Sequence, residues 1–218
     1  MILTGWSKRG SVEGGAGGNR RCDAVDRVMD VAETLFAASG YEAVSVGVIA
    51  EGSGVSKGNI FHHFESKDKL YFSVLKRACA KGAGTLREAA SGASDAGGKI
   101  SLFAHAHLRY LLDHPQRTKL LLRELVEGFF HLGAEFPKRE LAESFMLLME
   151  IIGEGQRKEE IRDDVDASVA SVALMAANIF VAAFGGFMQE IAAKEPGFFE
   201  KRFVPQLLKI FFEGARKG

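Results

Sequence analysis

The residues best suited to chemistry stand together in one short stretch, 57–64, which reads KGNIFHHF. Lys57, Asn59, His62 and His63 carry groups that form hydrogen bonds, and Gly58 leaves the backbone between them accessible. Such groups pair with the base edges and phosphate oxygens of DNA, which offer donors, acceptors and negative charge. The stretch therefore indicates recognition of nucleic acid.

The same stretch has the periodicity of a short helix with one apolar side. Ile60, Phe61 and Phe64 are spaced to face inward, so we expect all three in the core. Ser56 precedes them and can cap the helix, because its hydroxyl accepts from backbone N–H groups that have no partner in the first turn. The polar residues are then left on the outer side of the helix.

Another short helix is expected immediately before this one. Ser45 can cap it, and Val46, Ile49 and Ala50 form its apolar stripe. Gly54 can end it, because glycine adopts the left-handed conformation at a helix end without steric cost. Two helices joined so tightly predict a helix-turn-helix, a motif that places its second helix in the major groove of DNA.

These two helices resemble the DNA-binding signature of the TetR family of transcriptional repressors. The resemblance covers roughly Cys22 to Phe72, about a quarter of the chain. The residues that carry it are Ala32-Glu33-Thr34-Leu35-Phe36, Gly40-Tyr41, Ser45-Val46, Ile49-Ala50-Glu51, Gly54-Val55-Ser56-Lys57-Gly58, Phe61, His63-Phe64, Ser66-Lys67 and Leu70. It implies an all-α protein with an N-terminal three-helix DNA-binding domain and a C-terminal helical domain for ligand binding and dimerisation.

The expected DNA contacts differ in kind. Lys57 suits a phosphate or a base edge, Asn59 and His62 suit base edges, and His63 and Lys67 suit phosphates. The full set of expected DNA-binding residues is Ser45, Ser56, Lys57, Gly58, Asn59, His62, His63 and Lys67. Each could instead be a solvated surface side chain.

Some positions depart from the family's pattern. Phe61 stands where the family often has tyrosine, so a hydroxyl contact to phosphate is lost and Phe61 is expected in the core. Gly47 and Val48 occupy positions commonly filled by arginine or lysine and by aspartate, which removes a contact to the DNA backbone. Gly52 lowers helix propensity by about 1 kcal/mol relative to alanine.

Composition excludes several other classes. The formal net charge is zero, so bulk electrostatic binding is not indicated. The chain has two cysteines, Cys22 and Cys79, which are far apart along the sequence, so a disulfide framework is not indicated either.

No apolar run reaches the roughly 18 residues of a membrane span and no signal peptide is evident, so a cytoplasmic protein is expected. No hydrolase, metalloprotease or phosphate-loop motif occurs, so we expect neither an enzyme nor a bound cofactor. His105 and His107 would lie about 200° apart on a helix, which argues against a metal site.

Three segments are expected along the chain. Residues 1–19 are Gly-rich and polar and are predicted to be disordered, although Lys8, Arg9, Arg20 and Arg21 could instead follow DNA as a basic arm. Residues 20–66 form the DNA-binding domain, and residues 67–218 the effector-binding and dimerisation domain. The second and third segments should hold only helices, at about 25–39, 46–53, 57–64, 67–86, 99–114, 116–131, 137–160, 167–191 and 198–215, with a linker at 91–98.

The last two helices are the expected dimer interface. The segment 173–188, ALMAANIFVAAFGGFM, carries small residues that allow close approach of helices, and the last helix adds an apolar face. Doubled by a second copy, they would form a four-helix bundle, as the family's last two helices do. The same residues could alternatively form the core of a monomer.

The middle helices are expected to hold a small-molecule effector. Polar residues among apolar neighbours are the better indicators, because a buried polar group needs a partner. The expected effector-binding residues are Phe103, His107, Tyr110, Arg123, Glu127, Phe130, Phe145, Met149 and Asn178, with Leu111, Leu122, Glu124, Phe129, Met175 and Phe180 as further lining residues. Arg123 could instead pair with Glu127 one turn later on a solvated surface.

Together these features predict a dimeric transcriptional repressor that an effector releases from a pseudo-palindromic operator. Effector binding would shift the helix that begins at Lys67 and so change the separation of the two recognition helices. The alternatives are a ligand-responsive activator and a helical interaction protein without enzymatic activity.

Overall fold

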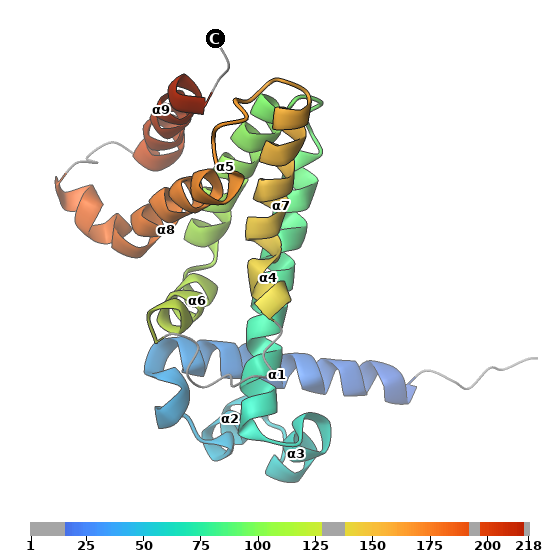
Figure 1. Ribbon diagram of the computed structural model, residues 1–218. Helices are drawn as coiled ribbons and strands as arrows, with labels where there is room; N and C mark the ends of the chain where they lie inside the picture. The colour runs from blue at the N-terminus through green and yellow to red at the C-terminus, as the bar shows by residue number, and fades with distance from the viewer. Residues whose placement is uncertain (1–15, 128–137, 192–196, 216–218) are drawn as a thin grey trace, which may run out of the picture.

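The computed structural model describes residues 16–127, 138–191 and 197–215. Within these ranges the chain is helical, with no strand (Figure 1). The elements are α1 (Ala16–Ala43), α2 (Val46–Ser53), α3 (Lys57–Phe64), α4 (Lys67–Ala90), α5 (Ala96–Asp113), α6 (Pro115–Glu127), α7 (Lys138–Arg157), α8 (Ala167–Ile191), the π-helical turn η1 (Phe199–Phe203) and α9 (Val204–Ala215). The predicted all-α fold class is confirmed.

The helices α1, α2 and α3 form a small N-terminal head. Helix α1 begins at Ala16, so it includes the end of the segment expected to be disordered, while Lys8 and Arg9 lie outside the described residues. Helical geometry is interrupted at Gly40, with φ 82° and ψ 171°, where the sequence predicted the end of the first helix. Gly54 ends α2 in the left-handed conformation, with φ 66°, which glycine adopts without strain.

Helix α4 connects the head to the C-terminal domain. Its first half contributes Leu70, Tyr71 and Val74 to the buried core of the head. Its second half contributes Leu86 and Ala90 to a separate core among α5, α7, α8 and α9. Figure 1 shows α4 rising out of the head beside α5 and α7, so any tilt of α4 must move the head relative to those helices.

The helix boundaries follow local capping chemistry that the sequence analysis predicted only in part. Asp166 caps α8, with Oδ1 accepting from the Ser168 and Val169 backbone N–H groups at 2.8 and 3.1 Å. Asp95 lies in the predicted linker 91–98, but it caps α5 by accepting from Gly98 N–H at 2.8 Å, so α5 begins at Ala96 rather than at residue 99. The last helical segment begins as the π-helical turn η1 and continues without a gap as α9.

Helix α8 is more apolar than the sequence analysis allowed. By length and composition alone, its window Ala167–Phe184 could cross a membrane, and 28% of that window is buried. The expectation that no segment would be long enough was wrong here because it counted uninterrupted apolar runs, and Ser171 and Asn178 interrupt this one. Both of those polar residues are buried where α8 packs on α5 and α7, while most of the apolar window is left unburied.

Candidate nucleic-acid interface

The head presents α3 as an exposed, capped helix. Ser56 Oγ accepts from Asn59 N–H at 3.3 Å, and Ser45 Oγ makes the equivalent bond with Val48 N–H at 3.3 Å at the start of α2. Ile60 and Phe64 are buried and anchor α3 to the head. Lys57, Gly58, Asn59 and His62 are exposed, and His63 is half-buried with its ring 5.3 Å from that of His62. The structure thus leaves the predicted residues Lys57, Gly58, Asn59 and His62 of α3 accessible, and His63 partly so.

Phe61 does not lie in the core. Its side chain is 45% exposed, so the expectation of a buried Phe61 was wrong. The buried residues Ile60 and Phe64 are one turn apart and define the inner side of α3. Phe61 is rotated by about 100° from Ile60, which places it on the flank of the helix rather than beneath it.

The side chain of Lys57 extends from α3 over α2 at Gly47, where α2 has no side chain. A Cβ atom built on Gly47 would lie 2.9 Å from both Cε and Nζ of Lys57, and 3.4 Å from Ser45 Oγ. The Lys57 ammonium therefore occupies the space over Gly47, close to the N-terminus of α2. Gly47 stands where the family commonly has a basic residue, and Lys57 of α3 fills the same region.

Lys67 is held against the head rather than extended from it. Its Nζ atom lies 4.0 Å from the centre of the Tyr41 ring, a cation–π contact. The Tyr41 hydroxyl donates a hydrogen bond to Asp68 at the start of α4. These contacts join the end of α1 to the start of α4 and place Lys67 beside the turn that follows α3.

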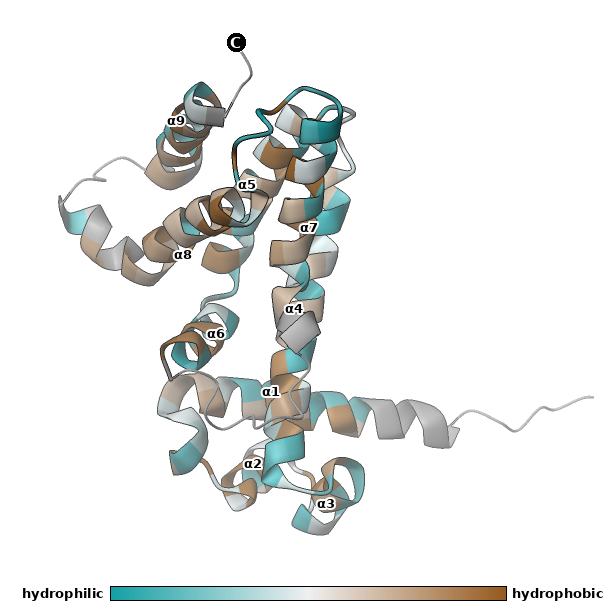
Figure 2. Cartoon of the chain, viewed as in Figure 1, coloured by the Kyte–Doolittle hydropathy of each residue, from teal (hydrophilic) through white to brown (hydrophobic). Residues whose placement is uncertain are grey.

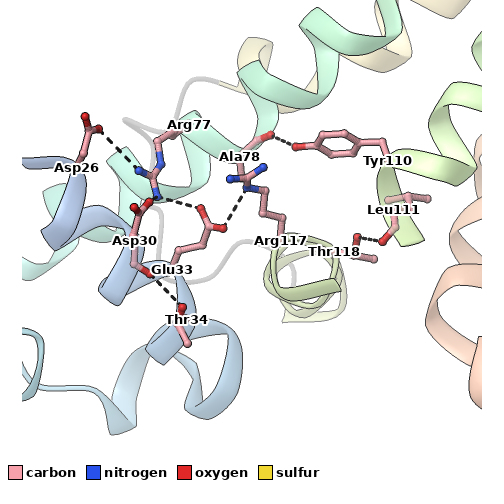
Figure 3. A network of polar contacts seen from close by, with 10 residues as sticks. All are labelled: Asp26, Asp30, Glu33, Thr34, Arg77, Ala78, Tyr110, Leu111, Arg117 and Thr118. Carbon is pink, nitrogen blue, oxygen red and sulfur yellow. Dashed lines mark hydrogen bonds and ion pairs between the residues drawn. The ribbon is translucent and has the colours of Figure 1, made fainter. Parts of the chain in front are cut away.

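A polar network joins α1 to α4 and α6 (Figure 3). Arg77 of α4 donates from Nη2 to Asp30 Oδ1 at 2.8 Å and to Glu33 Oε2 at 3.1 Å on α1. Arg117 of α6 donates from Nε to the other oxygen of Glu33 at 3.0 Å. No local sequence pattern predicts this network, because its residues are far apart along the chain.

Three of the expected effector-binding residues lie together between α5 and α8. Asn178 Nδ2 donates to the Ala104 carbonyl at 2.9 Å and lies 3.4 Å from Nδ1 of His107. The ring centre of Phe103 is 5.8 Å from that of His107. Burial lowers the pKa of His107 to about 4, so the imidazole is neutral and Nδ1 can accept the hydrogen bond from Asn178.

Other expected effector residues lie elsewhere. Tyr110 faces α4, where its hydroxyl donates to the Ala78 carbonyl at 3.1 Å. Arg123 lies over the backbone of Gly40 in the head, its Nη1 2.5 Å from where a Cβ would stand. Phe145 and Met149 are half-buried on α7, Met175 packs against the bundle core, and Phe180 is exposed on α8. Leu111 is buried and Leu122 half-buried, while the Glu127 side chain, Phe129 and Phe130 lie outside the described residues.

Glu124 is the remaining polar residue expected to line the effector pocket, but it contacts the core of the head instead. It is fully buried and accepts a hydrogen bond from the Tyr71 hydroxyl of α4. Arg117, Arg123 and Glu124 of α6 thus lie at the junction between the head and the C-terminal domain.

Comparison with known proteins agrees with this geometry. Residues 28–74 match the family model for bacterial regulatory proteins of the tetR family, a span that covers the last part of α1, the helix-turn-helix and the start of α4. The domain that carries the candidate interface belongs to this family of DNA-binding transcriptional regulators.

Individual relatives support the same assignment. The chain is 34% identical over 73 residues to the HTH-type transcriptional repressor AcnR of Corynebacterium efficiens, covering 34% of this chain and 39% of that protein. It is 35% identical over 121 residues to the HTH-type transcriptional activator FasR of Mycolicibacterium smegmatis, covering 53% of this chain and 45% of that protein. Both alignments span less than half of the relative.

The fold of nearly the whole chain is shared with solved structures of transcriptional regulators. A TetR-family regulator from Marinobacter aquaeolei VT8 superposes with a TM-score of 0.75 over 92% of this chain and 100% of that one, at 14% identity. The transcriptional regulator FadR from Bacillus subtilis, solved in complex with stearoyl-CoA, superposes with a TM-score of 0.70 over 87% of this chain and 98% of that one, at 19% identity. This similarity extends the assignment of the fold to the C-terminal helices.

Proposed function

We propose that the protein is a transcriptional repressor that binds a pseudo-palindromic operator as a dimer and leaves it when a small molecule binds. The observation that carries the proposal is the outer surface of α3, where Lys57, Asn59 and His62 are exposed on a helix anchored by Ile60 and Phe64. One such helix makes few base contacts. Two helices reading half-sites about one helical turn, roughly 34 Å, apart would supply the missing affinity and specificity.

Dimerisation through α8 and α9 is supported by the apolar residues that they leave exposed. Val169, Val172, Phe180, Phe184, Phe187 and Ile210 are each between 50% and 70% exposed. Figure 2 shows apolar colouring along both helices. In a monomer these side chains would be in water, whereas a second copy packed on α8 and α9 would bury them as a four-helix bundle.

The effector would bind in the C-terminal domain, where the buried pair His107 and Asn178 joins α5 to α8. Among the described residues, Asn178 Oδ1 is buried and has no hydrogen-bond donor within reach, so a ligand that supplies an O–H or N–H group would satisfy it. The complex of FadR with stearoyl-CoA supports a small-molecule effector in this fold. Helices α4 and α6 would carry the change to the head through Arg77, Arg117 and Glu33.

The same proposal assigns a role to each segment of the chain and a location in the cell. Residues 20–66 would bind DNA and residues 67–218 would bind effector and dimerise, with residues 1–19 as an N-terminal arm. A regulator that binds chromosomal DNA acts in the cytoplasm. The protein would need neither a cofactor nor a metal for this role, and it would have no enzymatic activity.

The test is selection of binding sequences from a random DNA pool by the purified full-length protein. Enrichment of a pseudo-palindrome with half-sites one turn apart, bound with a steep salt dependence, would support the proposal. Selection would be repeated on protein refolded from denaturant, which removes any co-purified ligand. Failure to enrich a motif in both preparations would contradict DNA recognition and favour a helical interaction protein.

A ligand-responsive activator is a second candidate, because FasR, a relative of similar identity, is named as an activator. The two roles differ in their effect on a promoter that carries the selected operator. Transcription from such a promoter in vitro should fall when the protein is added if it represses, and rise if it activates.

A further inference from the structure

Phe61 is an exposed aromatic side chain on the surface that the proposed function assigns to DNA. It is 45% exposed, while its neighbours Ile60 and Phe64 are buried. A phenyl ring cannot hydrogen-bond to a phosphate or a base edge, so it cannot act as Asn59 or His62 would. Its exposure leaves apolar area in water that a partner with an apolar group would cover.

The residues one turn before Phe61 determine what can approach its ring. Gly58 stands three positions earlier, and no atom lies within 4 Å of the position that a Cβ would take there. Lys57 stands four positions earlier, and its ammonium is directed toward Gly47 and the start of α2. The flank of α3 beside Phe61 is therefore open over Gly58, while the Lys57 ammonium lies toward the start of α2, where it would attract a phosphate.

The major groove offers one apolar group to such a ring. Each base pair presents hydrogen-bond donors and acceptors there, and only thymine adds an apolar group, its C5-methyl, which apolar side chains such as phenylalanine contact. A methyl group at the edge of the groove is also close to the phosphates that Lys57 would bind.

We propose that Phe61 determines specificity by packing against the C5-methyl group of one thymine in each half-site. The proposal rests on the DNA-binding function proposed above and deepens it, since it requires a thymine at one defined position of the operator. It assigns to Phe61 a role in sequence recognition in place of the role in the core that its residue type predicted.

The test is a double-mutant cycle between protein and DNA. Each thymine of the selected operator is replaced in turn by deoxyuridine, which removes the methyl group and keeps every hydrogen-bonding group. For the unmodified protein, one thymine position in each half-site should be sensitive, with the dissociation constant rising about four-fold per methyl removed. Phe61→Ala should bind the original operator more weakly and lose that sensitivity, and Phe61→Tyr, which keeps the ring, should retain it.

Val48→Ala is the matched control, because Val48 is an apolar residue of the same head with 49% exposure. This variant should keep the sensitivity to deoxyuridine. Thermal unfolding of each variant checks that the exposed substitutions leave the head folded.

The outcomes separate this inference from the function on which it rests. An operator that is bound specifically but is insensitive to every deoxyuridine would overturn the role of Phe61 and leave DNA recognition intact. Equal loss of sensitivity in Val48→Ala would overturn the assignment to Phe61. Absence of any selected operator would overturn both proposals together.

Discussion

Arg117 of α6 donates a hydrogen bond from Nε to Oε1 of Glu33 of α1 at 3.0 Å, although the two residues are 84 positions apart. Both side chains are largely buried, at 16% and 12% exposure. The second oxygen of Glu33 accepts from Arg77 of α4 at 3.1 Å. One carboxylate therefore holds α4 and α6, the two helices that connect the C-terminal domain to the head, against α1.

Replacing Glu33 with glutamine should destabilise the protein and weaken its response to effector. The change keeps the shape of the side chain but leaves two largely buried guanidinium groups with reduced charge compensation, at a cost of about 1–3 kcal/mol. Denaturant unfolding measures that cost. Asp30→Asn is the matched control, since Asp30 binds the same Arg77 but is 69% exposed, so its loss should be below about 1 kcal/mol. Equal losses in the two variants would contradict a special role for Glu33.

The short-range signals in the sequence were sufficient to predict the helix-turn-helix. Ser45 and Ser56 cap their helices, and Gly40 and Gly54 end theirs, because capping and left-handed turns depend on residues within one helical turn. The Glu33 contacts could not be predicted in this way, because they depend on how three helices come together.

Phe61 shows a different limit of sequence reasoning. Periodicity indicates that an apolar residue beside Ile60 belongs to the core, but the inner side of an eight-residue helix is narrow. Ile60 and Phe64 already fill it, so Phe61 is left on the flank. Among the expected effector residues, composition likewise could not distinguish Asn178, which faces His107, from Arg123, which lies over Gly40.

His107 should make the stability of the protein depend on pH between 5 and 6.5. Burial lowers its pKa from 6.5 to about 4, so the unfolded chain takes up a proton in this range and the folded chain does not. Stability is therefore fully present above pH 6.5 and is lost as pH falls, by about 1 kcal/mol per pH unit. Denaturant unfolding at several pH values should show this slope, and His107→Gln should flatten it.

The choice of pH range keeps the titration of Glu154 out of that measurement. Hydrogen bonds from Lys158 and Lys99 lower the pKa of Glu154 from 4.5 to about 2, so its contribution is lost only at more acidic pH. His105→Gln is the control, because it removes a half-buried imidazole from the same helix without touching Asn178. It should keep the slope of the unmodified protein, and an unchanged slope in His107→Gln would refute the assignment.

Phe184→Glu should convert the proposed dimer into a monomer. Phe184 is 50% exposed on α8 and packs on Phe180 with ring centres 4.8 Å apart, so a carboxylate there would be forced into the apolar interface. Met146→Glu on α7 is the control, at 49% exposure, and should remain dimeric. Sedimentation velocity at micromolar concentration distinguishes the two states. A dimeric Phe184→Glu variant would show that another surface mediates association.

Gly47→Ala should raise the stability of the head and weaken DNA binding. Alanine favours α2 by up to about 1 kcal/mol over glycine. Its Cβ would stand 2.9 Å from Nζ of Lys57, which is the flexible end of a side chain and can move aside at little cost. The displaced ammonium would then lose its position near the start of α2, and the salt dependence of operator binding should become shallower by about one unit per protomer.

Gly84→Ala provides the comparison that isolates this effect. Gly84 is likewise a glycine within a helix; it is exposed, whereas Gly47 is half-buried, and nothing lies within 4 Å of its added Cβ. It should therefore gain similar stability without any change in DNA affinity or in salt dependence. If Gly47→Ala behaves in the same way, the position of Lys57 over Gly47 contributes nothing to binding. Both variants make the same glycine-to-alanine change within a helix. If both gain stability but only Gly47→Ala binds DNA more weakly, the weaker binding comes from the displacement of Lys57.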